Sequence, residues 1–164
     1  MRRSAIISEC GLFRMRLDRD LEIPGKTAML CAVNPSKADG KIDDATIRKD
    51  VGFSARLGIG RFIKVNKFAL RATDVKELRT AADPVGPEND AYIRQAMREA
   101  DIHIACWGPL SKLPPNLRNR WRRVVEIARE EGVTFMCWGT AQDGHPRHPL
   151  MLAYDASLIE WKIP

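Results

Sequence analysis

A chain of 164 residues with 45% hydrophobic and 29% charged side chains has the composition of a globular protein, and we expect a single domain over residues 1–164. No apolar run approaches the roughly 20 residues of a membrane span, and the first nine residues are too weakly apolar for a signal peptide. We therefore expect a cytoplasmic protein without a membrane partner. The formal net charge of +6 favours an anionic partner. The oligomeric state stays open, with a monomer favoured.

Apolar runs along the chain predict a sheet of mostly parallel strands. The first two strands form a hairpin over residues 5–9 and 12–17, because the second run alternates apolar and charged side chains. Residues 27–33 lack this alternation, which is typical of a strand buried on both faces. Later apolar runs predict strands at residues 61–66, 102–107 and 133–138, with a short edge strand at residues 157–161.

Helical periodicity predicts the connections between these strands. The first helix has Asp43 or Asp44 as its N-cap and ends at Gly58. Later helices are expected around residues 74–79, over residues 87–100 with Pro87 at the first position, and from Pro114-Pro115 to about residue 131. Strands that alternate with helices favour right-handed βαβ units. The predicted fold is an α/β three-layer sandwich with a central, mainly parallel four-stranded sheet and an N-terminal β-hairpin.

Two predicted parallel strands end in a side-chain amide. Pro35 cannot donate to a β-ladder and biases Asn34 toward an extended backbone, so the buried strand ends by presenting Asn34. The strand over residues 61–66 ends at Asn66. In open α/β sheets, ligands bind outside the carboxyl ends of the strands. We therefore expect both amides at the edge of a pocket.

The later strand ends add aromatic and imidazole groups. Trp107 and Trp138 close their strands, Gly139 follows, and His148 lies in the loop after the last parallel strand. Aromatic rings offer faces on which bases stack, and amides can read the edge of a base. A histidine can stabilise a developing oxyanion or position a phosphate. The combination favours a ligand that contains a nucleobase.

Each of these residues also has a structural interpretation. Asn34 before a proline is typical of a turn, Asn66 can cap the next segment, and both tryptophans can pack helices against the sheet. The spacing of His145 and His148 resembles no standard metal pair. The four cysteines are isolated, and three of them lie in apolar runs, which favours packing in the core over a metal site. No dinucleotide fingerprint or Walker-type phosphate loop is present. We expect neither a metal nor a cofactor.

Basic side chains gather in the last third of the chain. They are candidates for nucleic-acid binding, and the alternative is a solvated helix face. The members of this group are Arg118, Arg120, Arg122, Arg123 and Arg147.

Several segments resemble the family called domain of unknown function 1643. The resemblance covers nearly the whole chain, and the family name implies no activity. The segments that carry it are residues 34–39, 43–48, 65–74, 84–90 and 144–150.

The order of the strand-end residues is also similar to the uracil-DNA glycosylase superfamily. Asn34-Pro35-Ser36 resembles the Asn-Pro-Gly motif that often ends the first central strand of those enzymes, and Asn66 matches their base-reading asparagine in position. His148-Pro149-Leu150 looks like a variant of their late His-Pro-Ser motif. The resemblance implies a glycosylase-like fold, a small parallel sheet between helices.

The same resemblance implies roles in cleaving an N-glycosidic bond. Asn34 would orient a water, and His148 would stabilise charge on the leaving base, so these two are the catalytic candidates. Asn66 would read the base, and Phe68 or a tryptophan would stack on it. The full set of candidate substrate-binding residues is Pro35, Ser36, Asn66, Phe68, Arg71, Trp107, Trp138 and Gly139.

Three functional hypotheses follow from the sequence. The first is an enzyme that acts on a nucleobase or nucleoside with glycosylase-like chemistry. The second is a non-catalytic module that binds a nucleotide or nucleic acid through the same pocket and the arginine-rich helix. The third is a hydrolase or transferase of a small phosphorylated molecule. The glycosylase-like hypothesis requires Asn34, Asn66 and His148 to line one cavity.

Overall fold

The apolar run in the first third of the chain forms the central strand of the sheet. In the computed structural model, which describes residues 1–164, strand β3 (Lys26–Ala32) pairs in parallel with β4 (Ile59–Asn66) on one side and β5 (Ile102–Ala105) on the other. Strand β6 (Met136–Cys137) pairs in parallel with β5. The predicted core of four parallel strands is therefore confirmed.

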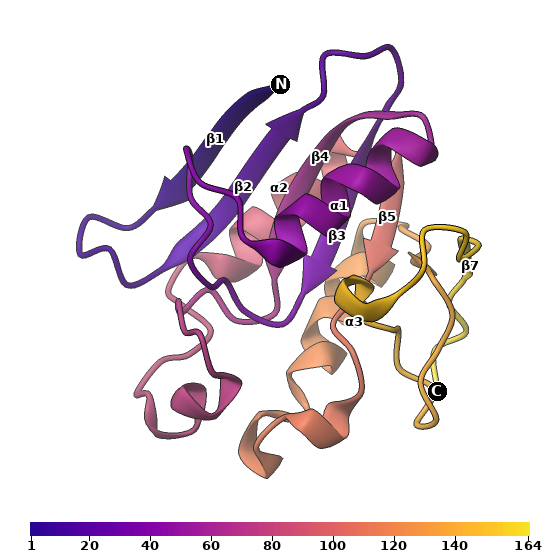
Figure 1. Cartoon of the computed structure of the whole chain (residues 1–164). Helices are drawn as coiled ribbons and strands as arrows, with labels where there is room; N and C mark the ends of the chain where they lie inside the picture. The colour runs from indigo at the N-terminus through magenta and orange to yellow at the C-terminus, as the bar shows by residue number, and fades with distance from the viewer.

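Antiparallel strands extend this sheet at both edges (Figure 1). Strand β2 (Arg14–Asp20) pairs with β4, and β1 (Arg2–Ile7) pairs with β2, so the predicted hairpin is confirmed as part of the main sheet. Strand β7 (Ile159–Glu160) pairs with β6. The result is an α/β fold with a mixed seven-stranded sheet in the order β1-β2-β4-β3-β5-β6-β7.

Helices pack on both faces of the sheet. Helix α1 (Ala45–Arg56) shares one hydrophobic core with the sheet, and α2 (Asn89–Glu99) and α3 (Arg120–Glu130) share a second core on the opposite face. The helices fall short of the length and apolar character that a membrane crossing demands. The short 3₁₀-helices are η1 (Val75–Thr80), η2 (Leu110–Lys112), η3 (Pro115–Leu117) and η4 (Pro149–Met151).

Two helix starts differ from the sequence-based expectation, whereas a third agrees with it. Asp44 is the N-cap of α1, which confirms one of the two N-cap residues that the sequence predicts. Pro87 lies before α2, because Glu88 is the N-cap of that helix. The helix predicted from Pro114 is split: Leu117 N–H bonds to the Pro114 carbonyl, which makes the 3₁₀-helix η3 before α3 begins.

The fourth parallel strand is shorter than the predicted 133–138. The N–H of Val133 bonds back to the carbonyl of Ala128, so residue 133 still belongs to the end of the helical turn. The Phe135 carbonyl accepts from Trp161 N–H, just outside the β6–β7 ladder. Pairing in β6 is therefore limited to Met136 and Cys137.

The alternation of side chains along β3 and β4 places polar groups on the face that α1 covers. In β4, Phe62 packs in the α1 core, and Ile63 and Val65 pack in the opposite core. Because successive side chains of a strand point to opposite faces, Lys64 and Asn66 share the α1 face with Phe62. The sheet thus carries a lysine and an amide toward α1, near the carboxyl end of β4.

Gly60 provides a test of the packing at the start of β4. A Cβ atom there would lie 2.5 Å from the backbone oxygen of Ile23, which belongs to the turn after β2 and has no freedom to withdraw. We expect Gly60→Ala to lower the free energy of unfolding by about 2 kcal/mol, measured by urea denaturation. Gly40→Ala is the matched control, because its nearest atom would be 3.6 Å away. Equal stability of the two variants would contradict this description.

Candidate functional site

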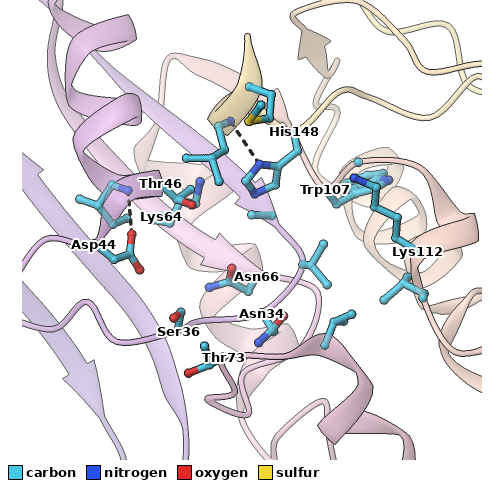
Figure 2. Close-up of a pocket in the computed structure, with 18 of the residues that line it drawn as sticks. Asn34, Ser36, Asp44, Thr46, Lys64, Asn66, Thr73, Trp107, Lys112 and His148 are labelled. Carbon is cyan, nitrogen blue, oxygen red and sulfur yellow. Dashed lines mark hydrogen bonds between the residues drawn. The ribbon is translucent and has the colours of Figure 1, made fainter.

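A cavity of about 670 Å³ opens at the carboxyl ends of β3, β4 and β5, on the side of the sheet that α1 covers (Figure 2). This volume is in the range of sites that bind small molecules. Its walls come from the strand ends, the start of α1, the segment before η1, and the loop that leads into η4. The polar and aromatic side chains that line it include Arg14, Asn34, Ser36, Asp44, Thr46, Lys64, Asn66, Thr73, Asp74, Trp107, Lys112, Arg147 and His148.

The amide of Asn34 is held in one orientation by the backbone. Its Nδ2 donates to the carbonyls of Ala72 at 2.9 Å and Pro35 at 3.1 Å. Two carbonyl oxygens can be satisfied only by the NH₂ end of the amide, so both donors of Asn34 are used. The side-chain oxygen remains as a fixed acceptor at the wall of the cavity.

Asn66 brings an unused donor to the same cavity. Its side chain is 1% exposed, and its Nδ2 has no hydrogen-bond partner in the protein. The backbone of Asn66 is braced from the other face, because Asn89 of α2 donates to its carbonyl at 2.9 Å. A buried amide without a partner costs free energy, and a ligand that accepts from it recovers that cost.

His148 is positioned by the loops around it. Gly108, at the end of β5, donates to the carbonyl of Pro146, and Arg147 N–H donates to the carbonyl of Gly139. The Nδ1 atom of His148 accepts from the N–H of Leu150 at 3.2 Å. This bond selects the tautomer with the proton on Nε2, and that ring nitrogen faces the middle of the cavity (Figure 2).

The electrostatic surroundings keep His148 neutral. Burial, together with the nearby charges of Lys64 and Lys112, lowers the pKa of His148 to about 4, although Asp44 acts in the opposite direction. The ring is therefore a neutral hydrogen-bond donor through Nε2 at physiological pH. Such a group can stabilise negative charge as it develops on a ligand atom.

A buried ion pair joins the sheet to α1 beside the cavity. Lys64 Nζ lies 2.8 Å from Asp50 Oδ2, and the two side chains are 2% and 0% exposed. Burial lowers the pKa of Lys64, but the Asp50 carboxylate raises it, and the net effect is a pKa above the ordinary value of lysine. Burial also raises the pKa of Asp50, which Lys64 opposes. Lys64 thus lines the cavity as a charged ammonium group, and the Asp50 carboxylate compensates its charge.

Sequence reasoning missed several charged residues of the site. The alternation of apolar and charged side chains in the second strand predicts that Arg14 faces solvent, yet it is 2% exposed and lines the cavity. Asp44 was assigned only a capping role, and one of its oxygens does accept from Ile47 N–H at 2.9 Å. Lys64 carried no signal because it lies inside an apolar strand. The sequence offers one indication of a carboxylate at the carboxyl edge of the sheet: Asp44 is a predicted N-cap in the segment that follows the central strand.

The structure brings together six of the residues predicted for the site and places the others elsewhere. Phe68 lies in a small separate core, and Trp138 stacks on Phe53 in the α1 core. Arg71 borders a shallow neighbouring hollow. Pro35 and Gly139 act through backbone carbonyls, which accept from Asn34 and Arg147. The six that line the cavity are Asn34, Ser36, Asn66, Trp107, Arg147 and His148.

Trp107 forms a rigid part of the cavity wall. Its indole Nε1–H donates to His145 Nδ1 at 3.2 Å, and its ring makes edge contacts with Phe135 and Trp161. The ring is 2% exposed, so only a small part of it faces the cavity. His145 is therefore a structural partner of Trp107.

The arginines before and within α3 are mostly engaged with the protein itself. Arg120 bonds to Asp90 at 2.5 Å and to the carbonyl of Lys67, and Arg123 pairs with Asp90, Glu126 and Glu130. Arg118 donates to the carbonyl of Leu113, and Arg122 lies over the Trp121 ring. None of these four lines the cavity, whereas Arg147 does.

The cysteines pack as the sequence predicts. Cys31, Cys106 and Cys137 are buried and free, and Cys10 is exposed. Burial raises the pKa of the Cys31 and Cys106 thiols to about 12, which makes them inert at neutral pH. Three of the four cysteines therefore act as small apolar core residues.

The fold and the cavity define an α/β protein with a ligand-sized site at the carboxyl edge of a mixed sheet. Comparison with known families assigns the chain more closely: it belongs to the family described as "Protein of unknown function (DUF1643)", which matches residues 14–150. The match confirms the resemblance noted in the sequence. No curated protein and no solved structure matches the chain.

The buried pair of Lys64 and Asp50 makes a prediction about stability. Asp50→Ala leaves the Lys64 ammonium uncompensated in the interior, and we expect a loss of about 3 kcal/mol in the free energy of unfolding, measured in urea. The double variant Lys64→Met, Asp50→Leu removes both charges and should recover most of that loss. Full stability of Asp50→Ala alone would show that the pair does not hold α1 against the sheet.

The depressed pKa of His148 makes a prediction about pH. In the folded protein its pKa is about 4, against an ordinary value of 6.5, so only the unfolded state binds this proton between these values. Stability should therefore fall as the pH drops from 6.5 to 4. The ring should titrate near pH 4 by NMR, and His148→Gln should show a shallower loss of stability over this range. A ring that titrates near 6.5 would contradict the assigned environment.

Proposed function

We propose that this protein hydrolyses the N-glycosidic bond of a nucleoside or nucleotide in the cavity at the carboxyl edge of the sheet. The observation that carries the proposal is the convergence of Asn34, Asn66 and His148 on one cavity, each with a different unused group. Asn34 offers a fixed acceptor, Asn66 an unpaired amide donor, and His148 a neutral ring N–H. These groups suit a water, a base edge and a leaving base.

The attacking water is positioned by Asn34 and activated by Asp44. An amide oxygen accepts a hydrogen bond from water but is too weak a base to take its proton, so a carboxylate is needed. Asp44 lines the cavity at the start of α1, with one oxygen bonded to the N–H of Ile47 (Figure 2). Its other oxygen takes the proton of the water as the water oxygen bonds to the anomeric carbon.

The leaving base is stabilised on the other side of the cavity. As the C–N bond breaks, its electron pair passes to the base, and negative charge develops on a ring carbonyl oxygen. The Nε2–H of His148 donates to that oxygen, and Asn66 donates to an acceptor on the edge of the base. One preorganised donor of this kind is worth about 3 kcal/mol in a transition state.

The fold is consistent with this chemistry. A core of parallel strands with helices packed on both faces is the arrangement that the resemblance to the uracil-DNA glycosylase superfamily implies. We therefore also propose that the three-layer fold of this protein is related to that superfamily. The first motif, the second strand-end amide and the late histidine lie at the same edge of the sheet. The departures from the superfamily motifs are Ser36, which lines the cavity, and Leu150, whose N–H orients His148.

A non-catalytic nucleotide-binding module is the second candidate. The unused donor of Asn66 supports binding of a base as such, without any reaction. The two candidates differ in whether a free base is released.

Substitution of the catalytic candidates tests the proposal. We expect the protein to release free base from at least one member of a panel of nucleosides, nucleoside 5′-monophosphates and uracil-containing DNA, detected by chromatography. Asn34→Ala and His148→Ala should each reduce kcat by roughly 10²–10³. Retained turnover in both variants would refute the assigned roles.

Matched controls separate these effects from general damage to the fold. His103→Gln changes a strand histidine bonded to the carbonyl of Met97, and Asn116→Ala changes an exposed asparagine in η3. Neither residue lines the cavity, so both variants should keep full turnover. Binding of a base without release of product, unchanged by Asn34→Ala, would favour the binding module.

A further inference from the structure

The interior of the protein contains five buried cations, and three of them are paired with carboxylates. Arg16 bonds to Asp18 and Glu99, Arg19 to Asp43, and Lys64 to Asp50. Pairing of this kind is expected, because a buried charge without a partner is costly. Two buried cations break the pattern.

Arg14 and Lys67 are buried without a carboxylate within 4 Å. Burial lowers the pKa of Lys67 to about 7, so this lysine can lose its charge. Burial lowers the pKa of Arg14 only to about 10, so its guanidinium remains charged at neutral pH. Arg14 is therefore a buried cation that keeps its charge at neutral pH and has no carboxylate within 4 Å.

Arg14 lines the cavity and has a side-chain donor without a partner in the protein. Its Nη1 donates to the carbonyl of Ala38 at 2.7 Å, and its Nε has no partner. Arg14 is 2% exposed, yet it lines the cavity. A charged guanidinium with an unpaired N–H donor, in a residue that lines a cavity, is suited to bind the oxygens of a phosphate.

Hydroxyl groups and a helix start line the same cavity as Arg14. Ser36 and Thr46 lie on the side of the cavity away from Trp107, with Thr46 beside Lys64 (Figure 2). Thr46 belongs to the first turn of the twelve-residue helix α1, whose N-terminus carries partial positive charge. Asp44 carries the opposing charge there, and its bond to Ile47 N–H keeps it at the helix cap.

We propose that Arg14, with the hydroxyls of Ser36 and Thr46, forms a subsite for the phosphate of a free nucleoside monophosphate. The nucleotide identity of the ligand rests on the proposed function, whereas the anion subsite rests on Arg14 itself. The base then lies toward Asn66 and Trp107, with His148 at its edge, and the phosphate lies on the side of the cavity away from Trp107. Asp44 lies beside the sugar.

The surface favours a free nucleotide over a nucleic-acid strand. Two of the α3 arginines that would track a backbone, Arg120 and Arg123, are paired with acids of α2 and α3. The cavity of about 670 Å³ has room for one nucleotide. Lys112 and Arg147 are exposed at its lining and attract an anion toward it.

Calorimetric titration of the full chain tests the subsite. The probes are the four ribonucleoside 5′-monophosphates and dUMP, the corresponding nucleosides, and a single-stranded oligonucleotide. At least one monophosphate should bind the wild-type protein about tenfold or more tightly than its nucleoside. In Arg14→Gln this preference should disappear, with nucleoside binding unchanged. The matched control Arg79→Gln removes the same charge from an exposed position on η1 and should retain the preference.

Thermal unfolding of Arg14→Gln separates binding from a structural role. Because the guanidinium is buried without a carboxylate, its loss should leave Tm unchanged or raised, and added monophosphate should no longer increase Tm. A lower Tm with the tenfold preference intact would overturn the proposal. Equal affinity of the wild type for nucleosides and monophosphates, or no binding of any monophosphate, would also overturn it.

The remaining outcomes distinguish the two proposals. Tighter binding of the oligonucleotide than of any monophosphate, with a steep dependence on salt, would reject the free nucleotide in favour of a strand. Base release from nucleosides without a phosphate preference would reject the subsite and leave the proposed hydrolysis intact. Monophosphate binding that depends on Arg14, without base release, would reject the hydrolysis and support the subsite.

Discussion

The buried ion pair between Lys64 and Asp50 is the interaction on which the site depends. It connects the centre of β4 to the middle of α1, and both side chains are removed from water. Burying two charges is costly unless their geometry is good, so the pair fixes where α1 lies against the sheet. That placement brings the start of α1, with Asp44 and Thr46, to the carboxyl ends of the strands.

The charge of Lys64 also shapes the chemistry of the cavity. The lysine lowers the pKa of His148 together with burial and Lys112, and the hydrogen bond from Leu150 selects the Nε2–H tautomer. The bonds from Asn34 to two carbonyls orient its amide in the same way, before any ligand arrives. Preorganised groups of this kind need no rearrangement when charge develops on a substrate.

Two buried polar atoms without a partner belong to residues of the cavity, whereas Lys67 Nζ, Asn89 Oδ1 and Trp138 Nε1 belong to residues outside it. Arg14 Nε and Asn66 Nδ2 are both buried and both belong to residues that line the cavity, and Asp50 Oδ1 lies next to Lys64. Buried polar groups are almost always bonded in stable proteins, so exceptions that share a cavity indicate a ligand better than any single residue does. The two donors lie on the walls where the proposed phosphate and base would bind.

Local patterns in the sequence determined the element types and the strand ends. The unbroken apolar run, the effect of Pro35 and the capping preference of Asp44 depend on neighbouring residues, so β3, Asn34 and the start of α1 were predictable. The same reasoning identified Asn66 and His148, because parallel strands bring their carboxyl ends together. It misplaced Phe68 and Trp138, since a large aromatic at a strand end packs equally well in the core.

Only the tertiary structure decided the charges of the site. Whether Arg14 faces water or the cavity, and whether Lys64 finds a carboxylate, depends on contacts between segments that are distant in the chain. The arginines near α3 looked free in the sequence, and acids on α2 and α3 engage two of them in the fold. Hydrophobic periodicity records which face of an element is buried, but the partner of a buried charge is set by the packing of whole elements.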